Sequence, residues 1–220
     1  MLQIDLHIHT NASSPCSLIE PEVMIERALE MDLDAVCVTE HDEIAGAEVA
    51  QELGRKYGLT VFRGIEIFTD LGDMLVYGLY RDAPGWKTPF EELLAMCRET
   101  GAVIIPAHPC RVTGELERLH GWERAKYMLG NVAAIETHNG GCSPDGNRAA
   151  LELGRRYGLP GIGGSDAHHL FQLGRCLTVF GEEITSDEEL VRALKTGHYR
   201  GVYPDEFHCT RSNPGPLETA

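Results

Sequence analysis

Short apolar runs alternate with helical segments along most of this chain. Residues 35–39, 60–67 and 102–107 are apolar almost throughout, as in strands covered on both faces. The segments 45–57 and 90–100 between them have the periodicity of helices, and each is followed by glycine, a common residue just past a helix end. Strands that alternate with helices predict an α/β fold built on a parallel sheet.

The ends of the predicted strands carry polar residues. His, Asp or Glu follows almost every apolar run, so these side chains must converge from all sides of the sheet. They can do so at the carboxyl-terminal face of a closed barrel, whereas the outer strands of an open sheet would hold them apart. The chain also lacks the G-x-G-x-x-G and P-loop motifs of nucleotide-binding folds. These features favour a (β/α) barrel with its functional site at that face.

The composition limits the partners of the chain. Its 220 residues suit one large domain, which we place at 1–203, followed by a polar, proline-rich tail at 204–220. The formal net charge of −15 disfavours binding to polynucleotides and to anionic membranes. The seven cysteines form no C-x-x-C pair, so neither a disulfide framework nor a zinc ribbon is indicated. Because no signal peptide and no apolar run of membrane-spanning length is visible, we expect a cytoplasmic protein.

His7 and His9 lie one residue apart in the alternating run at residues 2–10. Residues i and i+2 of a strand point to the same face, so both rings would project together from one strand end. Two neutral imidazoles in that arrangement suit a metal ion. Two polar strand residues without any ligand are the simpler alternative.

Four further segments place potential ligands at later strand ends. Taken singly they have simpler interpretations: the segment 39–42 as a polar loop that caps a helix, Glu66 as a salt-bridged core residue, and His108 as a satisfied core histidine. Their recurrence at successive strand ends favours a common metal site. To that site they would contribute His41, Glu66, His108, Asp166 and His168.

Histidine and carboxylate side chains together suit Zn²⁺, Mn²⁺ or Fe²⁺, and one carboxylate can bridge two ions. Two or more such ions would hold an oxyanion and generate a hydroxide nucleophile near neutral pH. The residues therefore favour metal-dependent hydrolysis.

The motifs H-x-H-T, T-E-H-D, G-x-E, A-H-P and G-S-D-A-H occur in this order. With them, residues 1 to about 180 resemble a short, stand-alone member of the polymerase and histidinol phosphatase (PHP) superfamily. The resemblance implies a distorted seven-stranded (β/α) barrel whose two or three divalent ions, Zn, Mn or Fe, serve to hydrolyse phosphate esters. It implies these ligands: His7, His9, Glu66 and Asp166 for one ion, Glu66 and His108 for a second, and His41 and His168 for a third.

The chain departs from the family pattern at two places. The loop 11–17 lacks the acidic residue or histidine with which many members hold the third ion, so we expect two tightly held ions and a labile third. No histidine follows Glu66 on the next strand, where Asp73 is either a substitute ligand or a turn residue. Glu40 stands where the family usually has aspartate, and we expect it to support the ligands rather than to bind metal.

Other polar residues near these motifs are candidates for substrate binding and catalysis. Arg111 follows the His108 strand, and its planar donors suit a phosphate group. Arg175 is a second candidate, with a surface arginine as the alternative, and Asn139 is expected to line the pocket. His138 is a less favoured metal ligand, and His168 is a candidate proton donor to the leaving oxygen.

We therefore expect a metal-dependent phosphoesterase that hydrolyses a small phosphate monoester or diester through a metal-activated hydroxide. The alternatives are a metal-dependent hydrolase of an amide or ester, and a non-catalytic metal-binding regulatory module. An arginine close to the metal ligands, such as Arg111, favours the phosphate ester. The sequence leaves the oligomeric state open.

Overall fold

The computed structural model describes residues 1–111 and 121–204. In these residues a seven-stranded sheet has the order β5-β4-β3-β2-β1-β8-β9, and β6 pairs with β7 in a separate ladder. The strands are β1 (Leu2–Ile8), β2 (Ala35–His41), β3 (Thr60–Thr69), β4 (Gly72–Tyr77), β5 (Val103–Pro106), β6 (Ile135–Asn139), β7 (Gly161–Gly164), β8 (Leu177–Phe180) and β9 (Tyr199–Val202).

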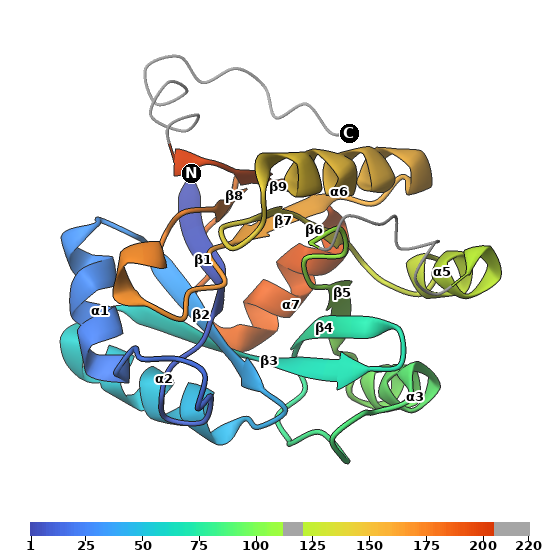
Figure 1. Ribbon diagram of the computed structural model, residues 1–220. Helices are drawn as coiled ribbons and strands as arrows, with labels where there is room; N and C mark the ends of the chain where they lie inside the picture. Colours follow the sequence, from blue (N-terminus) through green and yellow to red (C-terminus); the bar gives the residue numbers. More distant parts are fainter. Residues whose placement is uncertain (112–120, 205–220) are drawn as a thin grey trace.

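The large sheet curls, and the β6–β7 pair lies between its two ends (Figure 1). On one side β5 contacts β6, and the backbone N–H of Ala133 donates to the carbonyl of Ile104 at 3.1 Å. On the other side β7 contacts β1, β8 and β9, and the N–H of Gly163 donates to Thr178 Oγ1 at 2.8 Å. These contacts join both ends of the sheet, and the predicted distorted barrel is confirmed.

The prediction of a parallel sheet is correct only in part. The strands β1, β2 and β3 are parallel, as are β6 and β7. However, β4 is antiparallel to β3 and to β5, because only Asp70 and Leu71 connect β3 to β4 and a parallel return needs a much longer crossover. The strand β8 is likewise antiparallel to β1 and β9.

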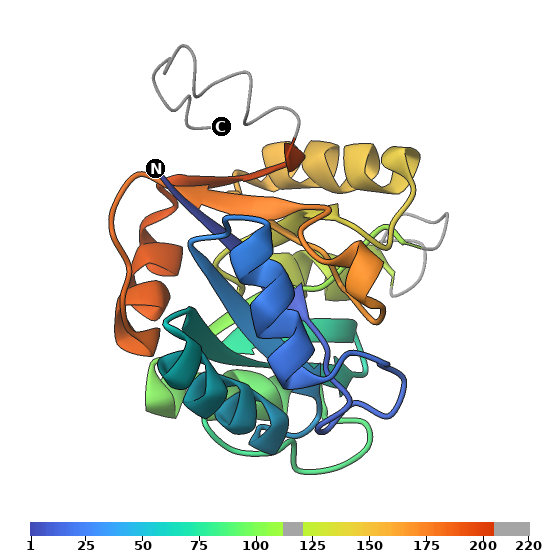
Figure 2. The ribbon, with the colours of Figure 1, turned by 90° about the vertical axis from the view of Figure 1, so that its left-hand side faces the viewer.

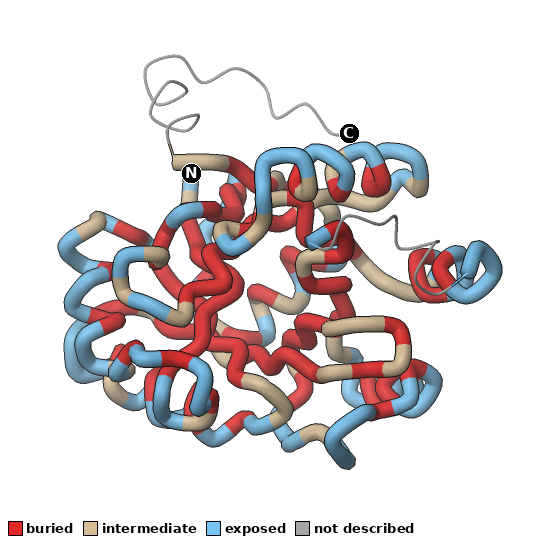
Figure 3. Tube along the Cα trace, viewed as in Figure 1, coloured by how far each residue is buried: buried red, intermediate tan, exposed pale blue. Residues whose placement is uncertain are grey.

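Helices cover the outside of the barrel. In Figures 1 and 2, α1 and α2 lie side by side next to the first strands, and Figure 3 shows that their exposed residues face outward while the strands are buried. The sequence predicted neither α5 nor β9. The helices are α1 (Pro21–Glu30), α2 (Ala45–Tyr57), α3 (Phe90–Thr100), α5 (Trp122–Leu129), α6 (Pro144–Tyr157) and α7 (Asp187–Thr196), with a 3₁₀ turn, η1, at Leu170–Gln172.

The helix α7 closes one end of the barrel instead of joining the outer layer. Its Leu190 and Leu194 belong to the same buried cluster as the inward-facing strand residues Leu6, Phe62 and Ile105. The helix contacts β3, β4 and β5. This packing occupies the end of the barrel interior at which β3 begins, whereas the predicted ligands lie at the opposite end, where β1, β2 and β3 finish.

Two glycines allow α2 and α6 to pack closely on neighbouring strands. A Cβ atom on Gly54 would lie 2.5 Å from Val61 Cγ2 and 2.7 Å from the carbonyl oxygen of Leu59. A Cβ atom on Gly154 would lie 3.0 Å from Ile135 Cγ2. The similar ends of these helices in the sequence therefore mark two similar helix–strand contacts.

The predicted tail, 204–220, lies outside the described residues apart from Pro204, so the domain boundary at 203 stays a prediction. None of the helices in residues 1–111 and 121–204 combines the length and the hydrophobicity that crossing a bilayer requires.

Candidate metal centre

Four predicted ligands meet where β1, β3 and β7 end. His7 lies on β1 and His9 just after it, Glu66 lies on β3, and Asp166 follows β7. The Nε2 atoms of the two histidines are 3.0 Å apart. Each of these nitrogens lies 3.2–3.6 Å from Glu66 Oε2 and from Asp166 Oδ1. We call these four side chains the first group.

The spacing of the first group fits a metal ion. Tetrahedral ligands at roughly 2.0–2.2 Å from an ion lie about 3.3–3.6 Å from one another. Glu66 Oε2 is buried and has no hydrogen-bond partner in the described residues, although His7, His9 and His41 each place a ring nitrogen within 3.4 Å of it. A buried oxygen in that condition is costly unless a cation accompanies it. The residues present therefore fit a divalent ion.

The electrostatics of the first group also favour a cation. Burial alone would lower the pKa of His7, but the carboxylates of Glu136 and Glu66 outweigh it and raise this pKa to about 10. Burial alone would raise the pKa of Glu66, but His7 and a hydrogen bond from His108 hold it well below its usual value. The buried carboxylates need a positive charge beside them, which protonated His7 provides. A bound divalent ion would provide that charge instead.

A second group contains His7, Glu66 and His108. His108 Nε2 lies 3.0 Å from Glu66 Oε1, so Glu66 faces the two groups with different oxygens, as a bridging carboxylate does. Asp73 Oδ2 lies 4.0 Å from His108 Nε2, at the edge of this group. Burial, followed by the charge of Glu66, raises the pKa of Asp73. An ion between these acids would relieve that crowding.

A third group contains His9, His41 and His168. The rings of His41 and His168 have centroids 4.3 Å and 4.5 Å from that of His9. Burial is the main reason that the pKa values of His41 and His168 are lowered to about 4. Both rings are then neutral at pH 7, with a nitrogen lone pair free to bind metal. The proton-donor role of His168 stays a prediction.

Two of the predicted ligands have a strained backbone. His108 has φ 30° and Asp166 has φ 52°, in the left-handed region that residues other than glycine seldom adopt. Each such residue costs on the order of 1–3 kcal/mol and persists only when its surroundings hold it. The N–H of Asp166 donates to the carbonyl of His7 at 2.7 Å, and the N–H of His108 donates to Glu136 Oε2 at 2.6 Å. Holding these two side chains in place therefore lowers the stability of the fold.

The loop after His9 supports the site without adding a histidine or carboxylate to the three groups. Glu40 accepts hydrogen bonds from the N–H of Thr10 at 3.0 Å and from Ser14 Oγ at 2.5 Å. Ser14 Oγ in turn accepts the N–H of His41 at 3.1 Å. Glu40 thus ties the loop to β2, and it belongs to none of the three groups.

Arg111 and Asn139 border the first group. Arg111 forms an ion pair with Asp166 while its side chain remains 40% exposed, so it faces both the ligands and the solvent. Asn139 Nδ2 lies 3.3 Å from Asp166 Oδ2. Arg175 is exposed, and its guanidinium lies over the ring of Phe171, 5.2 Å from the centroid. His138 contacts Thr137 and Tyr203, and it belongs to none of the three groups.

Comparison with known proteins supports the family suggested by the motifs. Residues 5–104 match the model of the PHP domain, and residues 144–199 match the PHP-associated model. An uncharacterized protein of Methanocaldococcus jannaschii is 30% identical over 127 residues, which cover 52% of this chain and 74% of that protein. The chain belongs to the PHP family.

Other relatives share shorter segments with this PHP protein. The 5'-3' exoribonuclease Rnm of Escherichia coli is 39% identical over 67 residues, which cover 30% of this chain and 22% of that protein. The phosphoribosyl 1,2-cyclic phosphate 1,2-diphosphodiesterase of Eggerthella lenta is 35% identical over 63 residues, which cover 29% and 23%. The structure of a two-domain protein from Bacteroides vulgatus with a PHP-like domain has the same fold, with a TM-score of 0.73, 21% identity, and coverage of 92% of this chain and 64% of that chain.

Sequence reasoning missed one residue of this PHP site. Glu136, on β6, is fully buried, and its Oε1 lies 3.0 Å from His7 Nδ1. It directly follows the apolar run 132–135, and the argument that a carboxylate on a buried strand needs a partner applies to it as to Glu66. That signal was present in the sequence.

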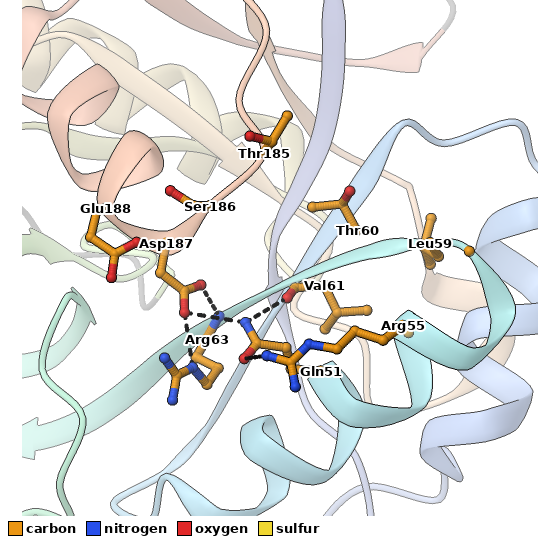
Figure 4. A pocket seen from close by; sticks show the side chains of 12 residues that line it. Gln51, Arg55, Leu59, Thr60, Val61, Arg63, Thr185, Ser186, Asp187 and Glu188 are labelled. Carbon is orange, nitrogen blue, oxygen red and sulfur yellow. Dashed lines mark hydrogen bonds and ion pairs between the residues drawn. The ribbon is translucent and has the colours of Figure 1, made fainter.

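A pocket of about 520 Å³ lies at the other end of this PHP barrel (Figure 4). It is formed by α2, the start of β3 and the start of α7. Asp187 accepts there from Arg63 Nε at 2.9 Å and from Gln51 Nε2 at 3.2 Å. None of the predicted ligands lines this pocket, so it is separate from the metal centre.

Proposed function

We propose that this chain hydrolyses a phosphate ester of a small molecule in a metal-dependent reaction. The observation that supports this best is the close approach of the four ligand atoms of His7, His9, Glu66 and Asp166, at distances that suit an ion among them. Arg111, beside the same cluster, favours a phosphate ester over an amide.

We assign the three groups to three ion positions. Ions bound there would supply Lewis acidity toward the phosphate oxygens and would lower the pKa of water near neutral pH. Zn²⁺, Mn²⁺ and Fe²⁺ are the candidates for this donor set. The proposed ligands are His7, His9, Glu66 and Asp166 for the first ion, Glu66, His108 and Asp73 for the second, and His41 and His168, next to His9, for the third.

The other residues at the mouth would bind and orient the substrate. Arg111 presents planar N–H donors at the edge of the cluster, where they can bind two phosphate oxygens. Asn139 is held by hydrogen bonds to Glu136 and Asp166, so its side chain is rigid. Arg175, on the segment after His168, would contact a second charged group of a substrate.

A small substrate is favoured over a polynucleotide by charge. With a net charge of −15 the surface repels a long polyanion, whereas a single phosphate group needs only the ions and Arg111. Relatives with short matches are named for both kinds of reaction, an exoribonuclease and a diesterase of a cyclic phosphate. The substrate test must therefore include both classes.

The test is a panel of phosphate monoesters, cyclic diesters and short oligonucleotides. The chain is first stripped with a chelator and then supplied with Mn²⁺, Fe²⁺ or Zn²⁺. We expect turnover of a small ester that disappears on chelation and returns with metal. Turnover restricted to oligonucleotides would contradict the small substrate, and absence of turnover with any ion would contradict the activity.

Arg111 distinguishes a phosphate substrate from a carbonyl substrate. Hydrogen bonds to charged groups are worth about 1.5–3 kcal/mol, so Arg111→Ala should lower kcat/KM for the best phosphate ester by about tenfold or more. Arg111→Lys should recover part of this loss, because it keeps the charge but not the planar fork. The same kinetics measured with a carboxylic ester should change little. Unchanged phosphate kinetics in both variants would remove Arg111 from the substrate site.

A further inference from the structure

One buried carboxylate contacts three parts of the proposed metal centre. Glu136 Oε1 lies 3.0 Å from His7 Nδ1, and Glu136 Oε2 accepts the backbone N–H of His108 at 2.6 Å. The same Oε2 accepts from Asn139 Nδ2 at 3.0 Å, and that amide also reaches Asp166. The side chains of Glu136 and His7 are both 0% exposed. Every contact of this carboxylate therefore leads to a proposed ligand.

The contact with His7 decides which ring nitrogen is free. A carboxylate can only accept hydrogen bonds, so His7 Nδ1 must carry the proton and donate it to Glu136. The lone pair of the neutral ring then lies on Nε2. That nitrogen is the one that faces His9, Glu66 and Asp166.

The contact with His108 holds a strained residue. His108 has φ 30°, and its short hydrogen bond to Glu136 Oε2 helps to offset the cost of that conformation. His108 belongs to the second group, and His7 joins the first to the second. Because one rigid side chain contacts both, it also sets the distance between them.

We infer that Glu136 is a positioning residue that keeps the His7 proton on Nδ1 and sets the spacing of the first two ion positions. The inference rests on the proposed metal centre but not on which ester is cleaved. Partners of metal-bound histidines in this position typically contribute 10–100-fold to metal affinity.

Glu136→Gln tests this role with little change of shape. A glutamine has one acceptor oxygen and one NH₂ group, and it cannot accept from His7, His108 and Asn139 as the carboxylate does. If its NH₂ faces His7, the proton of that ring must move to Nε2. If its NH₂ group instead faces the N–H of His108 and the amide of Asn139, hydrogen-bond donors face one another and those hydrogen bonds are lost.

The experiment is a titration of the metal-free chain with Co²⁺, followed by calorimetry and by visible absorption. We expect Glu136→Gln to bind Co²⁺ about 10–100-fold more weakly, with altered absorption bands. Asp187→Asn, a buried carboxylate at the other end of the barrel, is the matched control and should bind Co²⁺ as the unaltered chain does. A folded Glu136→Gln chain with unchanged affinity and bands would overturn the role of Glu136.

A second measurement needs no variant. In the Zn²⁺-loaded, ¹⁵N-histidine-labelled chain, NMR should show the His7 proton on Nδ1. A proton on Nε2 would overturn the inference even if Glu136→Gln failed to fold. If the unaltered chain bound no Co²⁺ or Zn²⁺ at all, the metal centre itself would be overturned, and this inference with it.

Discussion

His7 contacts several parts of the proposed metal centre. Its Nε2 faces the first group, the residue also belongs to the second group, and its Nδ1 contacts Glu136. Its backbone carbonyl also accepts the N–H of Asp166. A change of this side chain should therefore affect two ion positions together.

We predict that His7→Ala abolishes turnover, lowering kcat/KM by at least ~100-fold, because it removes a ligand rather than an outer partner of one. Kinetics and metal analysis on the same preparation measure the effect. His198→Ala, which removes an exposed imidazole, is the control and should keep both activity and metal. Full activity of His7→Ala after exhaustive chelation would refute metal catalysis.

Glu66 and Glu136 illustrate how far the sequence could lead at this scale. The motif around Glu66 was enough to assign it, and the structure brings it to the other predicted ligands. Glu136 had no such motif, and its partner His7 lies 129 residues away in the chain. Contacts of that range depend on how the barrel closes. The local sequence pattern could indicate that Glu136 is a buried carboxylate, but it could not indicate that His7 is its partner.

At the scale of elements, the strands and helices were predictable wherever one alternates with the other. The bounds of α2 and α3 agree with those expected, because a glycine directly follows the last residue of each helix. The direction of β4 was not predictable from periodicity, since it depends on the short link after β3. The strand β9 has four residues, Arg and Gly among them, and it follows α7 closely, so it gave no separate signal.

The two similar helix ends allow a comparison between Gly54→Ala and Gly154→Ala. Alanine favours a helix over glycine by about 1 kcal/mol, but overpacking costs about 1–3 kcal/mol. At Gly54 the new methyl group would lie 2.7 Å from the backbone oxygen of Leu59, which cannot move freely, whereas at Gly154 the corresponding backbone oxygen, that of Leu159, is 3.2 Å away. Urea unfolding should show Gly54→Ala to be destabilised by about 1–2 kcal/mol and Gly154→Ala to be nearer neutral. An equal change in the free energy of unfolding in the two variants would contradict this packing.

At the scale of the whole molecule, the proposed ligands join parts of the barrel that are distant in sequence. They come from β1, β2, β3 and β4 and from the segments after β1, β5 and β7. Metal bound among them would connect the large sheet to the β6–β7 pair. The acidic residues gathered there would also be neutralised in part.

Removing metal should therefore lower the stability of the entire barrel. At a free ion concentration of about 100 times Kd, binding contributes about 2.7 kcal/mol, which corresponds to a Tm higher by about 5–10 °C for a chain of this size. Calorimetry with and without a chelator measures the difference. Identical Tm values under the two conditions would mean that no ion binds to the folded chain.

The number of tightly bound ions is a further property of the whole site. The third group has His41 and His168 and shares His9 with the first, and the loop 11–17 adds no acidic residue. We expect metal analysis after gentle dialysis to give nearer two equivalents than three. Three equivalents that survive dialysis would show that the loop after His9 holds the third ion more strongly than its composition indicates.

The position of helix α7 affects how substrates reach the proposed ligands and how products leave them. It fills the barrel at the end where β3 begins, so in the described part of the chain the ligands are approached from the opposite side, where His41 and Arg111 are about two-fifths exposed. The ester and water that enter the site, and the alcohol and phosphate that leave it, would then use the same opening. If the proposed reaction takes place there, inorganic phosphate would occupy the same entrance and the same ligands as the ester, and we expect it to inhibit competitively.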